Sequence, residues 1–255
     1  MPKLQPLRLH LCLPWGKPIL GHQKRYDLGQ RHQMFITACS TGPFPWNENH
    51  VYYGERFNSL SHLSGLLLAV AGAVWLLAGT IHSGDGFHIA GAIIFSVAVI
   101  TLYAASTLYH STRTSPLKQM WERWDHCSIY LLIAGTVTPL VLRQSMDWSA
   151  WLALAVIWAL AVFGIFCEVR SNQGKAPSVW LYIGLGWAGV LSVLLDWNQL
   201  SQTSLLLLMA GALLYTAGTV FYRNTSNRRH AHGFWHLFVV GGTSCHFLSI
   251  SAHLL

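Results

Sequence analysis

Seven long apolar stretches separated by short polar segments make up most of the chain after residue 60. They are residues 60–81, 89–109, 126–142, 148–167, 176–195, 203–222 and 234–254, and none contains Asp, Glu, Lys or Arg. Each has about the 17–25 residues with which an α-helix crosses a bilayer, and none alternates apolar and polar positions as a membrane β-strand does. The pattern predicts an all-α integral membrane bundle of seven helices. Pro139, in the third stretch, predicts a kink and not an end, because membrane helices tolerate proline.

Composition and charge support a membrane protein and orient it. The chain is 53% hydrophobic and only 10% charged, whereas soluble domains carry about 25% charged residues. The formal charge of +7 would suggest a nucleic-acid partner in a soluble protein, but all Lys and Arg residues except Arg143 fall before the first stretch or in the three loops on its side. Basic loops stay cytoplasmic. We therefore expect a multi-pass protein of the cytoplasmic (inner) membrane, with the N-terminus inside, the C-terminus outside and no nucleic-acid partner.

Residues 1–54 differ from the rest of the chain. They hold six of the nine prolines and show no helical period, so we expect a disordered cytoplasmic tail followed by a membrane domain over residues 55–255. Translation from Met34 would remove much of this tail, and its role stays open. The five cysteines form no C-x-x-C pair, which argues against a disulfide framework or a thiolate metal site.

Polar residues gather at the predicted cytoplasmic ends of the helices, although ionisable groups are costly inside a membrane. Ser106 and His110 lie one turn apart at the end of the second stretch, Asp125 precedes the third, and His232 and His236 form an i, i+4 pair at the start of the seventh. Three imidazoles from two helices can bind Zn²⁺ and leave a fourth position for water. Asp125 would act as the base for that water. The Ser106 hydroxyl would orient a ligand group or a water molecule.

A fourth helix brings further polar groups to the same depth. Glu55, Asn58 and His62 share one face at the entry to the first stretch, where we expect them to support the metal ligands from behind. The alternative is a buried hydrogen-bond network without metal that locks the helices together.

Three other polar residues have simpler interpretations. His126 points about 100° away from Asp125 on a helix, so we expect only Asp125 to face the site. Glu122 is expected to be a solvated charge at the end of a loop. His246 shares a helix face with His232 but lies about 21 Å away along the axis. It is therefore either a polar contact between helices or part of a polar path through the bundle.

Four motifs together resemble the bacterial hemolysin III proteins, which are relatives of the progestin and adipoQ receptors, including the adiponectin receptors. The motifs are Glu55-Arg-Phe-Asn58-x-x-x-His62, Ser106-Thr-Leu-Tyr-His110, Asp125-His-Cys-Ser-Ile-Tyr-Leu-Leu-Ile-Ala-Gly-Thr and His232-Gly-Phe-Trp-His236. The resemblance covers about residues 50–255. The first 50 residues have no counterpart in it.

The resemblance implies seven spans and a zinc ion near the cytoplasmic face. It implies His110, His232 and His236 as the zinc ligands, Asp125 as the residue that holds a zinc-bound water, and Ser106 as the first residue of the S-x-x-x-H motif. The wider group is also similar to alkaline ceramidases, which suggests hydrolysis of lipid amides.

These features favour a zinc-binding membrane protein that hydrolyses an amide or ester bond of a membrane lipid. A sensor or receptor with a structural zinc is the first alternative, and a pore-forming hemolysin-type protein is the second. Haem binding is disfavoured, because two His one turn apart on a helix cannot supply opposite axial ligands. The substrate, the oligomeric state and any protein partners stay open.

Overall fold

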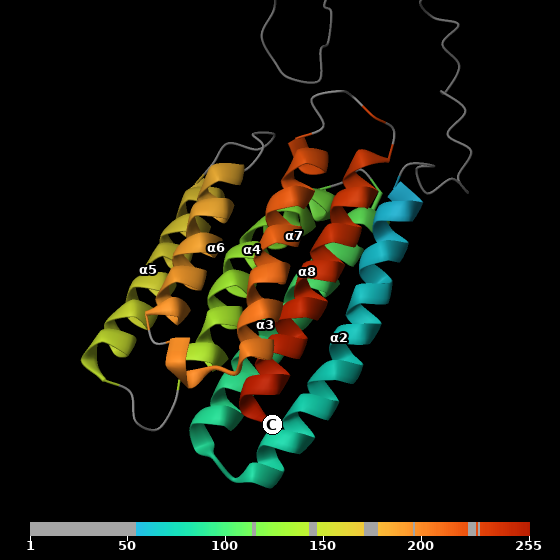
Figure 1. Cartoon of the computed structure of the whole chain (residues 1–255). Coiled ribbons are helices and arrows are strands. Elements are labelled where there is room, and N and C mark those ends of the chain that lie inside the picture. Colours follow the sequence, from blue (N-terminus) through green and yellow to red (C-terminus); the bar gives the residue numbers. More distant parts are fainter. Residues whose placement is uncertain are drawn as a thin grey trace, which may run out of the picture. The chain divides into compact units, whose positions relative to one another are not determined.

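The computed structural model describes residues 55–113, 116–142, 147–170, 178–195, 197–223, 228 and 230–255. They form seven α-helices and one short 3₁₀ helix (Figure 1). The helices are α2 (Glu55–Ser83), α3 (Gly86–Ser111), α4 (Pro116–Val141), α5 (Trp148–Arg170), α6 (Val179–Leu194), α7 (Gln202–Arg223) and α8 (Ala231–Leu254), with η1 (Trp197–Gln199) before α7. They match the seven predicted stretches in number and order, which confirms the all-α bundle. The predicted tail, residues 1–54, lies outside the described residues.

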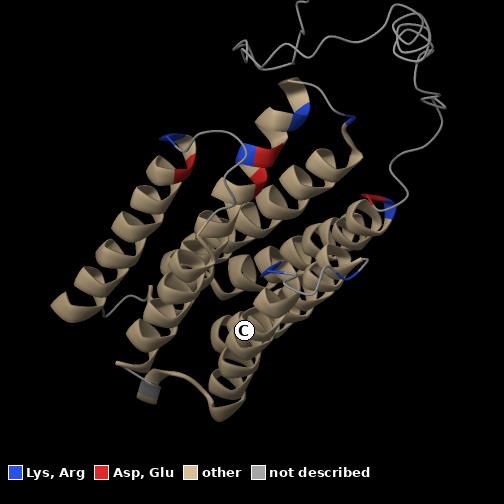
Figure 2. Cartoon of the chain, turned by 90° about the horizontal axis from the view of Figure 1, so that it is seen from above, with Lys and Arg blue, Asp and Glu red and all other residues tan. Residues whose placement is uncertain are grey.

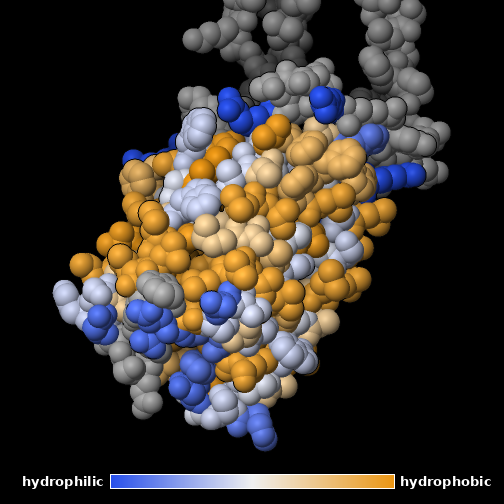
Figure 3. Space-filling model, in the orientation of Figure 1, coloured by the Kyte–Doolittle hydropathy of each residue, from blue (hydrophilic) through white to orange (hydrophobic). Residues whose placement is uncertain are grey.

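Lipid-facing surfaces cover most of the bundle. In the described part of the chain, five helices, α2, α3, α5, α7 and α8, are long and apolar enough to cross a membrane. Large apolar side chains point outward from them, among them Leu67, Val74 and Leu206, which are 65%, 65% and 72% exposed. Figure 3 shows the resulting broad apolar surface. An apolar surface of this extent requires lipid contact, and the chain is therefore a multi-pass membrane protein.

Helix α4 occupies the interior of the bundle and differs from the predicted third stretch. It begins at Pro116, ten residues before the expected start at His126, and continues through Pro139 to Val141. It packs against α3, α5, α6 and α8 (Figure 1), and its buried residues run from Cys127 to Val141. Its first turns contain no buried residue, and Leu117, Met120 and Trp124 are 51%, 41% and 51% exposed there. These turns extend past the apolar stretch and can therefore carry charge. Hydropathy alone therefore placed its start too late.

Helix α6 is the shortest of the seven. Its 16 residues span about 24 Å at 1.5 Å per residue, somewhat less than the roughly 30 Å hydrocarbon core. Part of the predicted fifth stretch, residues 176–177, lies outside the described residues.

Basic residues lie at one end of the bundle. Every described Lys and Arg is found there: Arg56, Arg113, Lys118, Arg123, Arg170, Arg223 and Arg228. We call this end, where α2, α4, α6 and α8 begin and α3, α5 and α7 finish, the basic end. Figure 2 shows the charges at helix ends and almost none along the helix shafts. The arrangement agrees with the alternation used to predict orientation, and the side of the membrane itself stays a prediction.

Candidate metal centre

Three histidines meet at the basic end. His110 lies in the last turn of α3, and His232 and His236 lie one turn apart at the start of α8. One possible ligand atom from each ring lies within 4.8 Å of the other two, and the ring centroids are 4.7–5.0 Å apart. His110 and His236 are buried and His232 is half-buried. The structure thus brings together the imidazoles that the sequence nominated.

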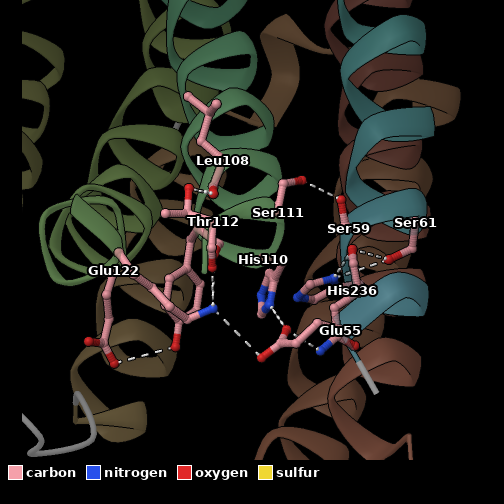
Figure 4. A network of polar contacts seen from close by, with 12 residues as sticks. Glu55, Ser59, Ser61, Leu108, His110, Ser111, Thr112, Glu122 and His236 are labelled. Carbon is pink, nitrogen blue, oxygen red and sulfur yellow. Dashed lines mark hydrogen bonds and ion pairs between the residues drawn. The ribbon is translucent and has the colours of Figure 1, made fainter. Parts of the chain in front are cut away.

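Acceptors on α2 hold the Nδ1 atoms of two of these rings (Figure 4). His110 Nδ1 contacts Glu55 Oε2. His236 Nδ1 lies 3.0 Å from the main-chain O of Asn58 and 3.1 Å from Ser61 Oγ. Carboxylate and carbonyl oxygens only accept hydrogen bonds, so each Nδ1 carries the proton and donates it. The Nε2 atoms are left with lone pairs, the usual arrangement when a second contact orients a metal-binding histidine.

Two Nε2 atoms have no other partner. Those of His110 and His232 are buried and make no hydrogen bond. Leaving a buried polar atom unsatisfied costs about 1–3 kcal/mol, and a metal ion would remove that cost. Imidazole nitrogens suit Zn, Cu, Fe and Ni. The three rings therefore fit a transition-metal ion, and the donor set alone does not select one metal.

The cluster supplies three candidate ligands. In the described ranges, the group that could hold a metal consists of three histidines and no fourth side chain. Structural zinc sites are closed by four protein ligands, whereas catalytic sites use three and keep one position open. The donor count is thus the one expected of a catalytic site.

Asp125 and Ser106 face the same cavity as two of the three histidines. Both line it together with His232 and His236. Ser106 is fully buried, and its Oγ interacts with the Asp125 carboxylate but makes no hydrogen bond of normal geometry to a described residue. The structure therefore places both residues where the sequence put them, and their chemical roles stay predictions.

The three residues proposed to support the ligands lie behind them on α2. Glu55 contacts His110, and Asn58 Nδ2 donates to Glu55 Oε2 at 3.2 Å. Asn58 reaches His236 through its main-chain oxygen and not through its side chain. His62 stacks on His236, with ring centroids 3.6 Å apart and planes inclined by 13°, and both of its ring nitrogens lack partners.

A cavity of about 460 Å³ extends from the histidines into the bundle. Its walls come mainly from α4, α6, α7 and α8, and its residues on α8 run from His232 to His246. That interval corresponds to about 21 Å of helix. The volume lies within the 300–1,000 Å³ typical of ligand pockets.

Two expectations about α4 were wrong. His126 lines the cavity together with Asp125, and its Nδ1 lies 2.9 Å from Glu168 Oε1. Glu122 also lines the cavity and accepts a hydrogen bond from Tyr109 OH at 3.4 Å. The cavity is wide enough for two adjacent residues of α4, Asp125 and His126, to line it. Since α4 continues to Pro116, Glu122 belongs to a helix and not to a loop.

Two contributing residues were missed. Ser61 contacts His236 Nδ1; it lies three residues after Asn58, so the helical spacing on α2 could have indicated it. Lys118 Nζ donates to the main-chain O of Tyr109 and of Thr112, both at 3.1 Å, and lies 3.9 Å from Glu55 Oε1. It joins α4 to the end of α3 beside the site. No pattern in the sequence indicates this contact.

A family model described as Haemolysin-III related matches residues 51–247. The chain belongs to this family. Among haemolysin-III relatives, the Hemolysin-3 homolog of Bacillus subtilis (strain 168) is 33% identical over 197 residues, covering 77% of this chain and 92% of that protein. Hemolysin-3 of Bacillus cereus is 30% identical over 202 residues, covering 79% and 92%. The monocyte to macrophage differentiation factor of Homo sapiens is 26% identical over 211 residues, covering 79% and 85%.

The comparisons confirm the resemblance read from the four motifs. The haemolysin-III match includes every candidate site residue, from Glu55 to His236, and it begins after residue 50. The candidate metal centre therefore lies within the part of the chain that defines the family.

Proposed function

We propose that this haemolysin-III-related protein is a zinc-dependent hydrolase of the cytoplasmic membrane that cleaves an amide or ester bond of a membrane lipid. One observation carries the proposal. Three buried or half-buried imidazoles meet without a fourth protein ligand among the described residues, and two of them, His232 and His236, line a largely apolar cavity. A metal ion bound at such a site would have one coordination position for a reactant, and the apolar cavity wall would contact an acyl chain.

Bound zinc would polarise the substrate carbonyl and lower the pKa of water to about 7. Asp125 would accept the proton of the attacking water and return it to the leaving nitrogen or oxygen. The buried Ser106 hydroxyl would donate to the substrate carbonyl or to the lipid head group. Glu55 and Asn58 would keep the His110 and His236 rings in the tautomers that present Nε2.

The cavity favours a lipid substrate over a soluble one. Most of the residues that line the cavity are apolar, and they are distributed along the chain between Leu102 and Val239. The polar lining groups concentrate near the two ends of the cavity. Transfer of an acyl chain into it would replace lipid contacts by protein contacts at little cost, so binding selectivity would come from the polar ends. The basic end would face the cytoplasm, because basic loops are retained there.

Metal analysis and hydrolysis assays of the purified full chain test the proposal. The parent should carry about one zinc per chain and hydrolyse at least one member of a panel of acyl amides and esters. His110→Ala and His236→Ala should lose most of the zinc. Asp125→Asn should keep zinc under saturating metal and lose hydrolysis by about 10²–10⁴-fold, the usual contribution of a positioned base.

His82→Ala serves as the control, because His82 is exposed at the opposite end of α2 and should change neither quantity. Absence of zinc from a parent purified without chelator would contradict the proposal. Stoichiometric zinc without hydrolysis of any substrate would favour a sensor with a structural metal.

A further inference from the structure

The cavity ends deep in the bundle at a second polar site, centred on His246 of α8. His246 is 8% exposed and lies about 15 Å along the helix from His236. Its ring packs directly on α7, where a Cβ at Gly211 would lie 2.2 Å from His246 Cδ2. The imidazole is therefore held in one place.

One hydrogen bond determines what His246 offers to the cavity. Its Nε2 lies 3.1 Å from the main-chain O of Leu208. That oxygen can only accept, so Nε2 carries the hydrogen. Nδ1 of the neutral ring is then a lone-pair acceptor, and no described residue donates to it.

The hydroxyl groups around His246 already donate their protons to other acceptors. Thr243 Oγ1 donates to Val239 O at 2.9 Å, so Tyr103 and Tyr215, at 2.9 Å and 2.6 Å, both donate to Thr243. Tyr215 and His246 have ring centroids 5.4 Å apart. The tyrosine nearest to His246 therefore has no proton left for a ligand.

Two threonines elsewhere in the cavity lining repeat this pattern. Thr216 Oγ1 donates to Ala212 O at 2.8 Å and accepts from Trp187 Nε1 at 3.2 Å. Thr136 Oγ1 donates to Leu132 O at 2.7 Å. Among the residues that the structure describes, this end of the cavity thus presents acceptors without an available donor. A carbonyl or carboxylate, which can only accept, would gain nothing from them.

We propose that the far end of the cavity binds a hydroxyl group carried on the acyl chain of the substrate, with His246 Nδ1 as its acceptor. The inference rests on the proposed function for the position of the reacting carbonyl near His236. With carbon–carbon bonds of about 1.5 Å at tetrahedral angles, an extended chain covers 15 Å in about twelve carbons. The substrate class is therefore a lipid whose acyl chain is hydroxylated near its middle, and His246 determines specificity.

Competitive binding to the full chain in lipid nanodiscs tests the inference without hydrolysis. 12-Hydroxyoctadecanoic acid, octadecanoic acid and 2-hydroxyoctadecanoic acid each displace a fluorescent fatty acid. The 12-hydroxy acid should bind about 3–10-fold more tightly than the unsubstituted acid, the gain from one neutral hydrogen bond. The 2-hydroxy acid should show no such gain, because its hydroxyl lies too close to the carboxyl end to reach His246.

Substitutions at His246 test whether this residue causes the preference for the 12-hydroxy acid. His246→Phe and His246→Met remove the acceptor and keep an apolar group of similar size, so both should bind the 12-hydroxy and unsubstituted acids equally. His246→Gln retains an acceptor and should keep part of the preference. His253→Phe, on the same helix outside the cavity lining, should behave as the parent.

Equal binding of the two acids by the parent would overturn the inference, as would a preference that survives in both His246→Phe and His246→Met. Because the readout is binding, a parent that prefers the 12-hydroxy acid but hydrolyses nothing would refute the proposed function alone. A parent that hydrolyses lipid amides without any hydroxyl preference would refute only the role of His246.

Discussion

Individual residues determine how firmly the candidate metal ligands are held. His110 is oriented by the Glu55 carboxylate, whereas His236 is oriented by two neutral acceptors, Asn58 O and Ser61 Oγ. Hydrogen bonds to a charged partner are roughly twice as strong as neutral ones. The two rings should therefore respond differently when one partner is removed.

Glu55→Gln should lower zinc affinity by about 10–100-fold, the usual effect of losing a partner behind a metal ligand. The amide can still accept from His110 Nδ1, but it lacks the charge that makes the imidazole a stronger ligand. Competition with a fluorescent zinc chelator measures the change. Asp147→Asn, an acidic-to-amide change at the opposite end of the bundle, should leave the affinity unaltered. Equal affinities of Glu55→Gln and the parent would show that Glu55 does not support the metal.

Ser61→Ala should weaken zinc binding less than Glu55→Gln does. Asn58 O remains 3.0 Å from His236 Nδ1 and keeps the tautomer after the hydroxyl is lost. The same chelator competition compares the two variants. A larger loss in Ser61→Ala would mean that the serine, and not the main-chain oxygen, orients His236.

Helix contacts determine how closely α3 and α4 pack at the end of the bundle opposite the candidate metal centre. Gly91 on α3 faces Pro139 on α4, where an added Cβ would lie 2.8 Å from the Pro139 Cα atom. A main-chain atom inside a buried helix cannot shift alone. Both helices bring residues to the cavity, so their separation affects its shape as well as stability.

Gly91→Ala should destabilise the bundle by about 1–3 kcal/mol, the usual cost of overpacking a core. The helix preference of alanine over glycine recovers at most about 1 kcal/mol, so strain dominates. Thermal unfolding in detergent measures the effect. Gly184→Ala on α6, where a Cβ would meet nothing within 4 Å, should be neutral or slightly stabilising. Equal unfolding temperatures of the two variants would contradict the close contact.

The loop that joins α2 to α3 should be sensitive to acid. Main-chain N–H groups of His88 and Phe87 donate to the Asp85 carboxylate and hold its pKa below its usual value. A depressed carboxyl pKa stabilises the folded state at pH above the unfolded-state pKa of about 3.9. That contribution falls as the pH drops from there through the folded-state pKa.

Amide hydrogen exchange of Phe87 and His88 should therefore accelerate, relative to the intrinsic rate, as the pH falls below about 4. In Asp85→Asn this added acceleration should be absent, because the amide side chain does not titrate. If the protection of both amides in the parent stays constant across this pH range, the Asp85 carboxylate is not the titrating group.

At the scale of the whole molecule, the distribution of charge decides orientation in the membrane. All described basic residues lie at the basic end (Figure 2). The candidate metal centre lies at the same end. The chain leaves this end through α8 and finishes at the opposite end. If basic segments stay in the cytoplasm, the metal centre faces the cytoplasm and the C-terminus lies outside.

A reporter enzyme that is active only outside the cytoplasm should be active when it is fused after Leu255 and silent when it is fused after Tyr222. A reporter that is active only in the cytoplasm should show the reverse pattern. Activity of the first reporter after Tyr222 would invert the orientation and place the metal centre on the outer face.

The sequence by itself determined the number and order of the helices, because lipid exposure requires long charge-free stretches. It also nominated His110, His232 and His236, since polar residues at helix ends stand out against an apolar background. Only the tertiary structure showed that the apolar part of α4 is internal and that the helix begins at Pro116. Hydropathy cannot separate lipid contact from contact with other helices, and it does not mark a helix that extends past its apolar stretch. The tautomers at the metal centre, the role of Ser61 and the acceptor-lined far end of the cavity likewise came from the structure. Each depends on which atoms of different helices face one another, and the packing of the bundle sets those contacts.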